Sequence, residues 1–140
     1  MRRILVPVDG SDNALRAVRY AASLAKELPD VQLELLNVQD PLPNHVRAVL
    51  SESDIARWQS GYSSLVLEPA TQILDASHVP YRVGSRVGSP ANEISQQVHD
   101  RECDAIIMGT RGLGSLASLV IGSVATKTIH MAKVPVTLIK

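Results

Sequence analysis

Three glycines and a serine in the last third of the sequence have a spacing that could bind phosphate. Gly109, Gly112, Gly122 and Ser123 form the pattern G-x2-G-x9-G-S. Glycine lets backbone N–H groups approach phosphate oxygens because no Cβ intervenes, and a helix beginning after Gly122 would add unpaired N–H groups and a positive dipole end. From spacing alone, a phosphate loop and a loop whose glycines only make turns fit about equally well.

A carboxylate near the start of the chain could form a second part of the same site. Asp9 follows the apolar run at residues 4–8, so it would stand at the carboxyl end of the first strand. There it could accept hydrogen bonds from ribose hydroxyls or hold a metal ion through water. Aspartate at such a junction also commonly forms turns and helix caps, and Ser11 has the same two roles open to it.

The surrounding residues predict the elements that must position these groups. Short apolar runs predict strands over residues 4–8, 31–38, 80–87, 104–108 and 135–139. Apolar residues at helical spacing predict helices that begin after Ser11 or Asp12, near Ile55, at Pro90 and at a Ser123 cap. Pro69 is expected to kink and break the second helix near Glu68, because an interior proline costs about 3 kcal/mol.

Strands and helices that alternate in this order indicate an α/β fold. We expect a three-layer, doubly wound, five-stranded parallel sheet with helices on both faces, because each parallel crossover is right-handed and carries a helix. The 140 residues suit a single domain over residues 1–140. Ligands bind beyond the carboxyl ends of such strands. The loops after Val8, Val38, Val87 and Met108 are therefore predicted to surround a ligand.

Composition and charge narrow the classes of partner. Fourteen basic residues balance fourteen acidic ones, so no net field draws the chain to nucleic acid or to anionic lipid. The single cysteine, Cys103, cannot form an internal disulfide and fits a reducing compartment. The apolar run in the N-terminal MRRILVPVDG is too short for the core of a signal peptide or for a membrane span. We expect a cytoplasmic protein that binds neither nucleic acid nor membrane.

Several stretches of the chain match the motifs of one known family. They are ILVPVDGS at residues 4–11, a valine after Asn37, VGSPANEI at 87–94, DAIIMGTRG at 104–112, GSVATK at 122–127 and VPVTLIK at 134–140. Over essentially its whole length the sequence resembles the universal stress protein family, and the glycine pattern is typical of its ATP-binding branch. Gly114, an additional glycine, and Pro69, inside a helix that is usually continuous, depart from the family pattern.

The resemblance implies a fold like that of the adenine nucleotide alpha-hydrolases, with ATP as ligand and Mg²⁺ or Mn²⁺ held mainly through the phosphates, with Asp9 as one further candidate ligand. By resemblance, the residues around the phosphates and ribose are Gly109, Gly112, Gly122 and Ser123, with Arg111 reaching the phosphates. Those lining or bordering the adenine and ribose pocket are Pro7, Val8, Asp9, Val38, Met108 and Val124.

Other nucleotide and metal sites fit the sequence less well. The loop lacks the G-K-[S/T] ending of a Walker P-loop, and the first strand lacks the G-x-G-x-x-G of a dinucleotide fold. A phosphoacceptor receiver domain needs an aspartate after its middle strand, where this chain has Val87-Gly88. The four histidines are scattered without metal-ligand spacing and are expected to be solvated surface residues.

The sequence contains no convincing catalytic residue for ATP hydrolysis. Hydrolysis needs a positioned base or water-orienting group as well as charge stabilisation. Arg111 could supply charge, but Asp9 is the only carboxylate expected in the crevice, and ribose or metal is its expected partner. The first hypothesis is a nucleotide-responsive regulatory module in stress response, acting on an unknown protein partner. The alternatives are a slow ATPase switch and an interaction dimer that binds no nucleotide.

The C-terminal strand is expected to form a homodimer. Residues 134–139 are short, apolar and last in the chain, so this strand is predicted to lie at an edge of the sheet with unpaired backbone groups. Pairing with its own copy about a two-fold axis would satisfy those groups. Lysine at Val136 is expected to prevent that pairing.

Overall fold

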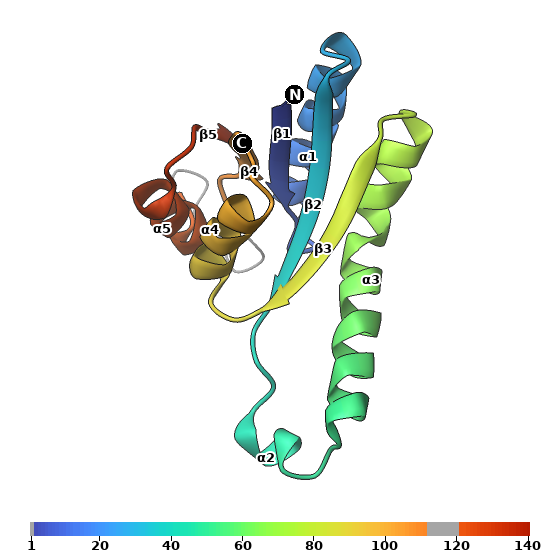
Figure 1. Ribbon diagram of the computed structural model, residues 1–140, viewed down its shortest axis with the longest axis vertical. Helices are drawn as coiled ribbons and strands as arrows, with labels where there is room; N and C mark the ends of the chain where they lie inside the picture. The colour runs from blue at the N-terminus through green and yellow to red at the C-terminus, as the bar shows by residue number, and fades with distance from the viewer. Residues whose placement is uncertain (1, 112–120) are drawn as a thin grey trace.

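The computed structural model describes residues 2–111 and 121–140, which form a five-stranded parallel sheet with helices on both faces (Figure 1). The strands are β1 (Arg2–Pro7), β2 (Val31–Gln39), β3 (Tyr81–Val87), β4 (Ala105–Gly109) and β5 (Val136–Ile139). They are arranged in the order β3-β2-β1-β4-β5, and every pairing is parallel. The predicted fold class is confirmed.

The helices cover the sheet in two layers (Figure 1). Helices α1 (Asp12–Glu27) and α3 (Glu52–Ala76) share one apolar core with β1 and β2. Helices α4 (Pro90–Asp100) and α5 (Ser123–Met131) form the other core, on the opposite face. After β1 the chain builds outward to β2 and β3, and later returns to place β4 on the other side of β1. The order of the strands therefore reverses between β1 and β4, which is where ligands bind in sheets of this kind.

The first strand is central because its residues are apolar on both faces. Leu5 contacts the α4 and α5 core, whereas Ile4 and Val6 contact the α1 and α3 core, and all three are almost fully buried. Such continuous burial explains the unbroken apolar run in the sequence. At the end of the strand, Ser11 caps α1, with its Oγ accepting a hydrogen bond from the Ala14 N–H at 3.1 Å.

The structure corrects the expectation for Pro69. Helix α3 runs without interruption from Glu52 to Ala76, so Pro69 does not break it. The proline removes the N–H that would bind the carbonyl of Leu65. Both residues lie on the exposed side of α3, and Leu65 is 70% exposed, so water can bind that carbonyl instead. A short helix, α2 (Asn44–Arg47), lies between β2 and α3, where no element was predicted.

The predicted cap of α5 is also wrong. Gly122 occupies the N-cap position with extended backbone, at φ −64° and ψ 161°, and Ser123 is already the first helical residue. Gly122 has no side chain to accept a hydrogen bond from the first turn. Helix α4 begins at Pro90, as predicted, and Ser89 stands at its N-cap, although the serine side chain makes no capping hydrogen bond.

Buried polar groups on the α4 face were not signalled by the sequence. Glu34, in the middle of β2, is 3% exposed and accepts hydrogen bonds from Arg101 Nε at 2.9 Å and Gln97 Nε2 at 2.8 Å. Cys103 is buried nearby, and its burial raises the pKa of the thiol to about 11.

All four histidines are exposed, as expected. Within residues 2–111 and 121–140, no helix combines the length and apolar character needed to cross a membrane.

Strand β5 lies at an edge of the sheet, as predicted, and pairs with β4. Its side chains alternate between the two faces. Val136 and Leu138 pack against the α4 and α5 core, whereas Thr137 is exposed. A lysine at Val136 would therefore disturb the core as well as the edge, so Thr137 is the better position at which to test the edge.

Candidate functional site

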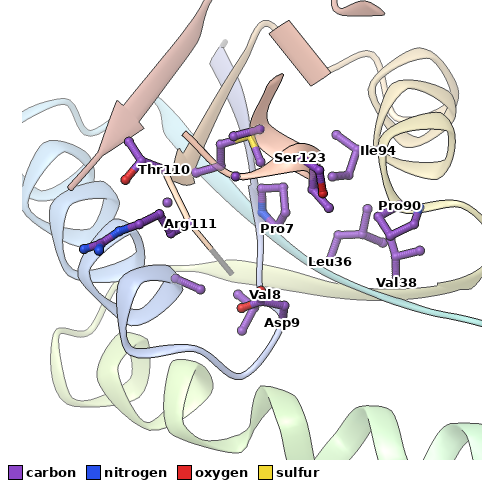
Figure 2. A pocket seen from close by; sticks show the side chains of 16 residues that line it. Pro7, Val8, Asp9, Leu36, Val38, Pro90, Ile94, Thr110, Arg111 and Ser123 are labelled. Carbon is purple, nitrogen blue, oxygen red and sulfur yellow. The ribbon is translucent and has the colours of Figure 1, made fainter. Parts of the chain in front are cut away.

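A pocket of about 390 Å³ opens where the order of the strands reverses (Figure 2). It lies at the carboxyl ends of β1, β2 and β4 and at the first residues of α4 and α5. Every predicted site residue that the structure describes lines it: Pro7, Val8, Asp9, Val38, Met108, Gly109, Arg111, Gly122, Ser123 and Val124. Gly112 and Gly114 lie outside the described residues.

Sequence reasoning missed several residues that line the same pocket. They are Ala14, Leu36, Pro90, Ile94, Thr110 and Ala125. A signal existed for some of them. Leu36 is two positions before Val38 and therefore lies on the same face of β2, and Pro90 follows one of the four loops that were predicted to surround a ligand.

The pocket has an apolar half and a polar half. Figure 2 shows Leu36, Val38, Pro90 and Ile94 gathered on one side and Thr110 and Arg111 on the other. Leu36 and Ile94 are also members of the core on the α4 and α5 face, so rigid packing supports the apolar half. This half is suited to a flat apolar group, and the opposite half to a charged one.

The apolar half includes a backbone donor and acceptor that lack a backbone partner in the described part of the chain. The β1–β2 pairing ends with the Val8 N–H, which donates to the Leu36 carbonyl at 2.8 Å. Backbone groups alternate along a strand, so the N–H and C=O of Val38, two residues after Leu36, also face the β1 side of β2. At that level β1 has already ended. The Val8 carbonyl, which the Val38 N–H would otherwise bind, accepts from Asn37 Nδ2 at 2.9 Å instead. Among the described residues, neither backbone group of Val38 has a backbone partner on that side.

The pocket also borders the N-terminus of α5, whose N-cap residue Gly122 has no side chain to cap it, and Figure 2 shows Ser123 beside Ile94. The first backbone hydrogen bond of this helix runs from the Thr126 N–H to the Gly122 carbonyl at 3.0 Å. The N–H groups of Ser123, Val124 and Ala125 therefore have no partner within the helix, and all three residues line the pocket. Three N–H groups without a partner among the described residues, at the positive end of a helix dipole, can form a site for an anion.

Asp9 fixes the turn before α1 and also lines the pocket. Its Oδ1 accepts hydrogen bonds from the Ser11 N–H at 2.9 Å and from the Ser11 hydroxyl at 2.6 Å, which fixes the turn before α1. Its Oδ2 has no hydrogen-bond partner among the described residues, and the exposed side chain lines the pocket. One carboxylate oxygen thus maintains the turn while the other is available to a ligand.

The segment after β4 is held by residues from three parts of the chain. The Thr110 N–H donates to the Ile139 carbonyl at 2.9 Å, and the Gly122 N–H donates to the Thr110 carbonyl at 2.6 Å. Asn13 on α1 accepts from the Arg111 N–H at 2.8 Å. No group of three or more histidine, cysteine or acidic side chains that could hold a metal ion is found in the described part of the chain.

Comparison with known sequences identifies relatives over nearly the whole chain. The sequence profile of the universal stress protein family matches residues 1–140. A universal stress protein of Methanocaldococcus jannaschii is 31% identical, and the match covers 99% of this chain and 82% of that protein. One from Thermus aquaticus is 30% identical, with 99% of this chain and 98% of the relative covered.

Solved structures match the fold over a similar span. A second M. jannaschii universal stress protein, 27% identical, superimposes with a TM-score of 0.78 over 99% of this chain and 95% of its own. A universal stress protein in complex with cAMP is 20% identical, with a TM-score of 0.77 and coverages of 99% and 97%. The Archaeoglobus fulgidus protein in complex with dAMP is 23% identical, with a TM-score of 0.67 and coverages of 100% and 98%.

Proposed function

The chain belongs to the universal stress protein family, and we propose that its pocket binds ATP. In this proposal residues 1–140 form one cytoplasmic domain that acts as a nucleotide-responsive regulatory module in stress response. The observation that carries it is the composition of one pocket, with an apolar half and an uncapped helix N-terminus facing the same space. A nucleotide has the same two parts, an apolar base and an anionic phosphate chain.

The base is assigned to the apolar half. Leu36, Pro90 and Ile94 supply the surface against which a purine ring can pack. The N–H and C=O of Val38, which have no backbone partner within residues 2–111 and 121–140 on that side, supply one donor and one acceptor. Adenine presents an acceptor ring nitrogen beside its N6 amino donor, so it can hydrogen-bond with both groups of one residue.

The phosphates are assigned to the start of α5 and to Arg111. The unpaired N–H groups of Ser123, Val124 and Ala125 can bind phosphate oxygens, and the arginine adds the positive charge. Asp9 lines the pocket, and in this proposal its Oδ2 accepts from a ribose hydroxyl or binds a metal-coordinated water. The family fold is known to hold cAMP and dAMP in the two complexes described above, both of which contain adenine.

Mass spectrometry of the purified protein tests this proposal directly. Protein prepared without added nucleotide is denatured, and the released ligand is identified and quantified. ATP is the expected product. Another adenine nucleotide would keep the pocket assignment and change the ligand. If no nucleotide is released and calorimetry detects no ATP binding, the interaction dimer is the hypothesis that remains. Phosphate release well above background that is lost in Asp9→Ala or Arg111→Ala would favour the slow ATPase.

ATP binding is expected to weaken by about tenfold when divalent metal is removed. Arg111 is the only basic side chain among the described residues that line the pocket, so the protein neutralises little of the triphosphate charge. Mg²⁺ or Mn²⁺ bound to the phosphates supplies the remainder. Calorimetry with excess Mg²⁺ and with excess EDTA measures the difference. Equal affinities in the two titrations would contradict a metal-dependent site.

The proposed homodimer uses the free edge of β5. The carbonyls of Pro135 and Ile139 face β4, accepting from the N–H groups of Ile106 and Thr110 at 2.9 Å each. By alternation, the backbone groups of Val136 and Leu138 face outward from the edge. A second copy related by a two-fold axis near Thr137 would pair with them in an antiparallel arrangement and extend the sheet across both protomers.

Thr137→Lys is expected to convert the dimer to a monomer. The two-fold axis places each Thr137 opposite its copy, and like charges directly opposite each other destabilise a strand pair. Ser85→Lys, an exposed position on β3 at the other edge of the sheet, is the matched control and is expected to leave the dimer intact. Light scattering at micromolar concentration measures both masses. A dimeric Thr137→Lys protein would exclude this interface.

A further inference from the structure

We propose that Asn13 is a positioning residue that holds the first residues of the phosphate-binding segment in their binding conformation. The proposal deepens the proposed function and rests on it for its effect on nucleotide affinity. Asn13 lies in the first turn of α1 and is 7% exposed. It does not line the pocket, and the sequence pattern gave it no role.

The side-chain amide of Asn13 joins two segments that are distant in sequence. Its Oδ1 accepts a hydrogen bond from the backbone N–H of Arg111 at 2.8 Å. Its Nδ2 donates to the backbone carbonyl of Ile139 at 3.0 Å. Because one partner is a fixed donor and the other a fixed acceptor, the amide has a single satisfactory orientation. Asparagine is an uncharged side chain of the right length that carries both the acceptor for the Arg111 N–H and the donor for the Ile139 carbonyl.

The neighbouring glycine leaves the space that this amide occupies. A Cβ at Gly109 would lie 2.4 Å from Asn13 Oδ1 and 2.9 Å from Asn13 Cγ. The amide therefore lies directly against the backbone at the end of β4. Gly109 and Arg111, on either side of Thr110, both contact Asn13, so the amide fixes the direction in which the chain leaves the sheet.

The hydrogen bonds continue from Asn13 to the start of α5. The Ile139 carbonyl that binds Asn13 also accepts from the Thr110 N–H, and the Thr110 carbonyl accepts from the Gly122 N–H. Gly122 is the N-cap of the helix whose first N–H groups are assigned to phosphate. A shift of the Asn13 amide would therefore move both Arg111 and the start of α5, the two sources of positive potential in the pocket.

Asn13→Asp gives a test that depends on pH. The ionised carboxylate can still accept from the Arg111 N–H, but it cannot donate to Ile139 and repels that carbonyl. The protonated carboxyl group has one donor and one acceptor, as asparagine does. Burial and the facing Ile139 carbonyl raise the pKa of the new carboxyl group, whereas the Arg111 N–H and the positive end of α1 lower it, so protonation is complete only at the lower pH values. ATP affinity is therefore expected to be roughly tenfold below wild type at pH 8 and within about threefold of it at pH 5.

Each affinity is measured by calorimetry with ATP and Mg²⁺ and is divided by the wild-type value at the same pH. Dividing by the wild-type value cancels the effect of pH on ATP itself and on the titratable groups that both proteins contain. These include the charged residues near Asn13 in sequence or adjoining its hydrogen-bond partners: Asp9, Asp12, Arg16, Arg111 and Lys140. Asn44→Asp, at an exposed position on α2, makes the same chemical change and is expected to give a ratio near one throughout.

A purely structural role for Asn13 predicts a different result. Melting temperature would then vary with pH in Asn13→Asp, while the affinity ratio would stay constant wherever the protein is folded. An affinity ratio near one at every pH would overturn the proposal.

Hydrogen exchange in nucleotide-free protein separates this proposal from the proposed function. In Asn13→Ala the Arg111 amide has lost its acceptor and is expected to exchange at least about tenfold faster than in wild type. The Leu33 amide in the central part of β2 is the internal reference. An unchanged Arg111 rate would exclude the positioning role. A faster rate in a protein whose wild type binds no ATP would retain the positioning role and reject the nucleotide site.

Discussion

Gly122→Val is expected to abolish detectable ATP binding while the protein stays folded. The backbone at Gly122 has φ −64° and ψ 161°, which valine adopts readily, so the substitution imposes no left-handed strain. The structure therefore removes the explanation in which this glycine is needed for a turn with positive φ. Gly122 lines the pocket beside the unpaired N–H groups of α5. A β-branched side chain there would occupy the space assigned to phosphate and displace charge-assisted hydrogen bonds of about 1.5–3 kcal/mol each.

Calorimetry and thermal melting together measure this effect. Gly61→Val is the matched control, because Gly61 lies in α3 away from the pocket and a Cβ there would meet no atom within 4 Å. The control is expected to bind ATP like the wild type and to be at least as stable, because valine has a higher helix propensity than glycine and its Cβ meets free space. Wild-type ATP affinity in a folded Gly122→Val protein would refute the phosphate site at the start of α5.

Gly109→Ala is expected to lower both stability and ATP affinity. The added Cβ would lie 2.4 Å from Asn13 Oδ1 and 3.0 Å from the Asn13 carbonyl carbon, distances at which atoms must move. Moving the amide breaks its hydrogen bonds to Arg111 and Ile139, and moving the backbone shifts α1. The free energy of unfolding is expected to fall by about 1–3 kcal/mol, the usual cost of overpacking. ATP affinity is expected to fall by more than about tenfold, because Gly109 and Arg111 line the pocket.

Urea unfolding and calorimetry measure the two effects, with Gly61→Ala as the control at a site with free space. The clash with Asn13 gives a further check. In the double variant Gly109→Ala, Asn13→Ala, the Oδ1 and Cγ atoms are absent, so its destabilisation should be smaller than the sum of the two single effects. Additive effects, or unchanged stability in Gly109→Ala, would mean that the end of β4 can adjust without contacting Asn13.

Both predictions concern glycines, but the structure gives the two residues different reasons to be glycine. At Gly109 the protein itself fills the space, because the Asn13 amide lies against the backbone. At Gly122 the backbone conformation suits any residue. Gly122 lines the pocket, so the space that its missing side chain leaves is assigned to the ligand. The spacing of glycines in the sequence could not separate these two cases, since spacing carries no information on what approaches each Cα.

Local features of the sequence predicted the strands and most of the helices. Apolar runs and helical spacing depend on neighbouring residues, so the central strand at Ile4–Val6 and the capped start of α1 at Ser11 could be inferred directly. The predicted cap of α5, Ser123, is one residue away from the observed cap, Gly122. Serine is the better capping residue by type, but the helical backbone already begins at Ser123. The break expected at Pro69 does not occur, because the cost of the proline depends on whether water reaches the freed carbonyl, which the fold decides.

The sequence by itself also determined where the pocket would be, because parallel strands joined by helices bring their carboxyl ends to one edge of the sheet. Only the tertiary structure decided how that pocket is supported. Asn13 is 98 residues from Arg111 and 126 from Ile139, and Glu34 is 67 residues from Arg101. No local pattern pairs side chains across such separations. Each of these hydrogen bonds forms because the packed layers exclude water from polar groups that must then find partners inside the protein.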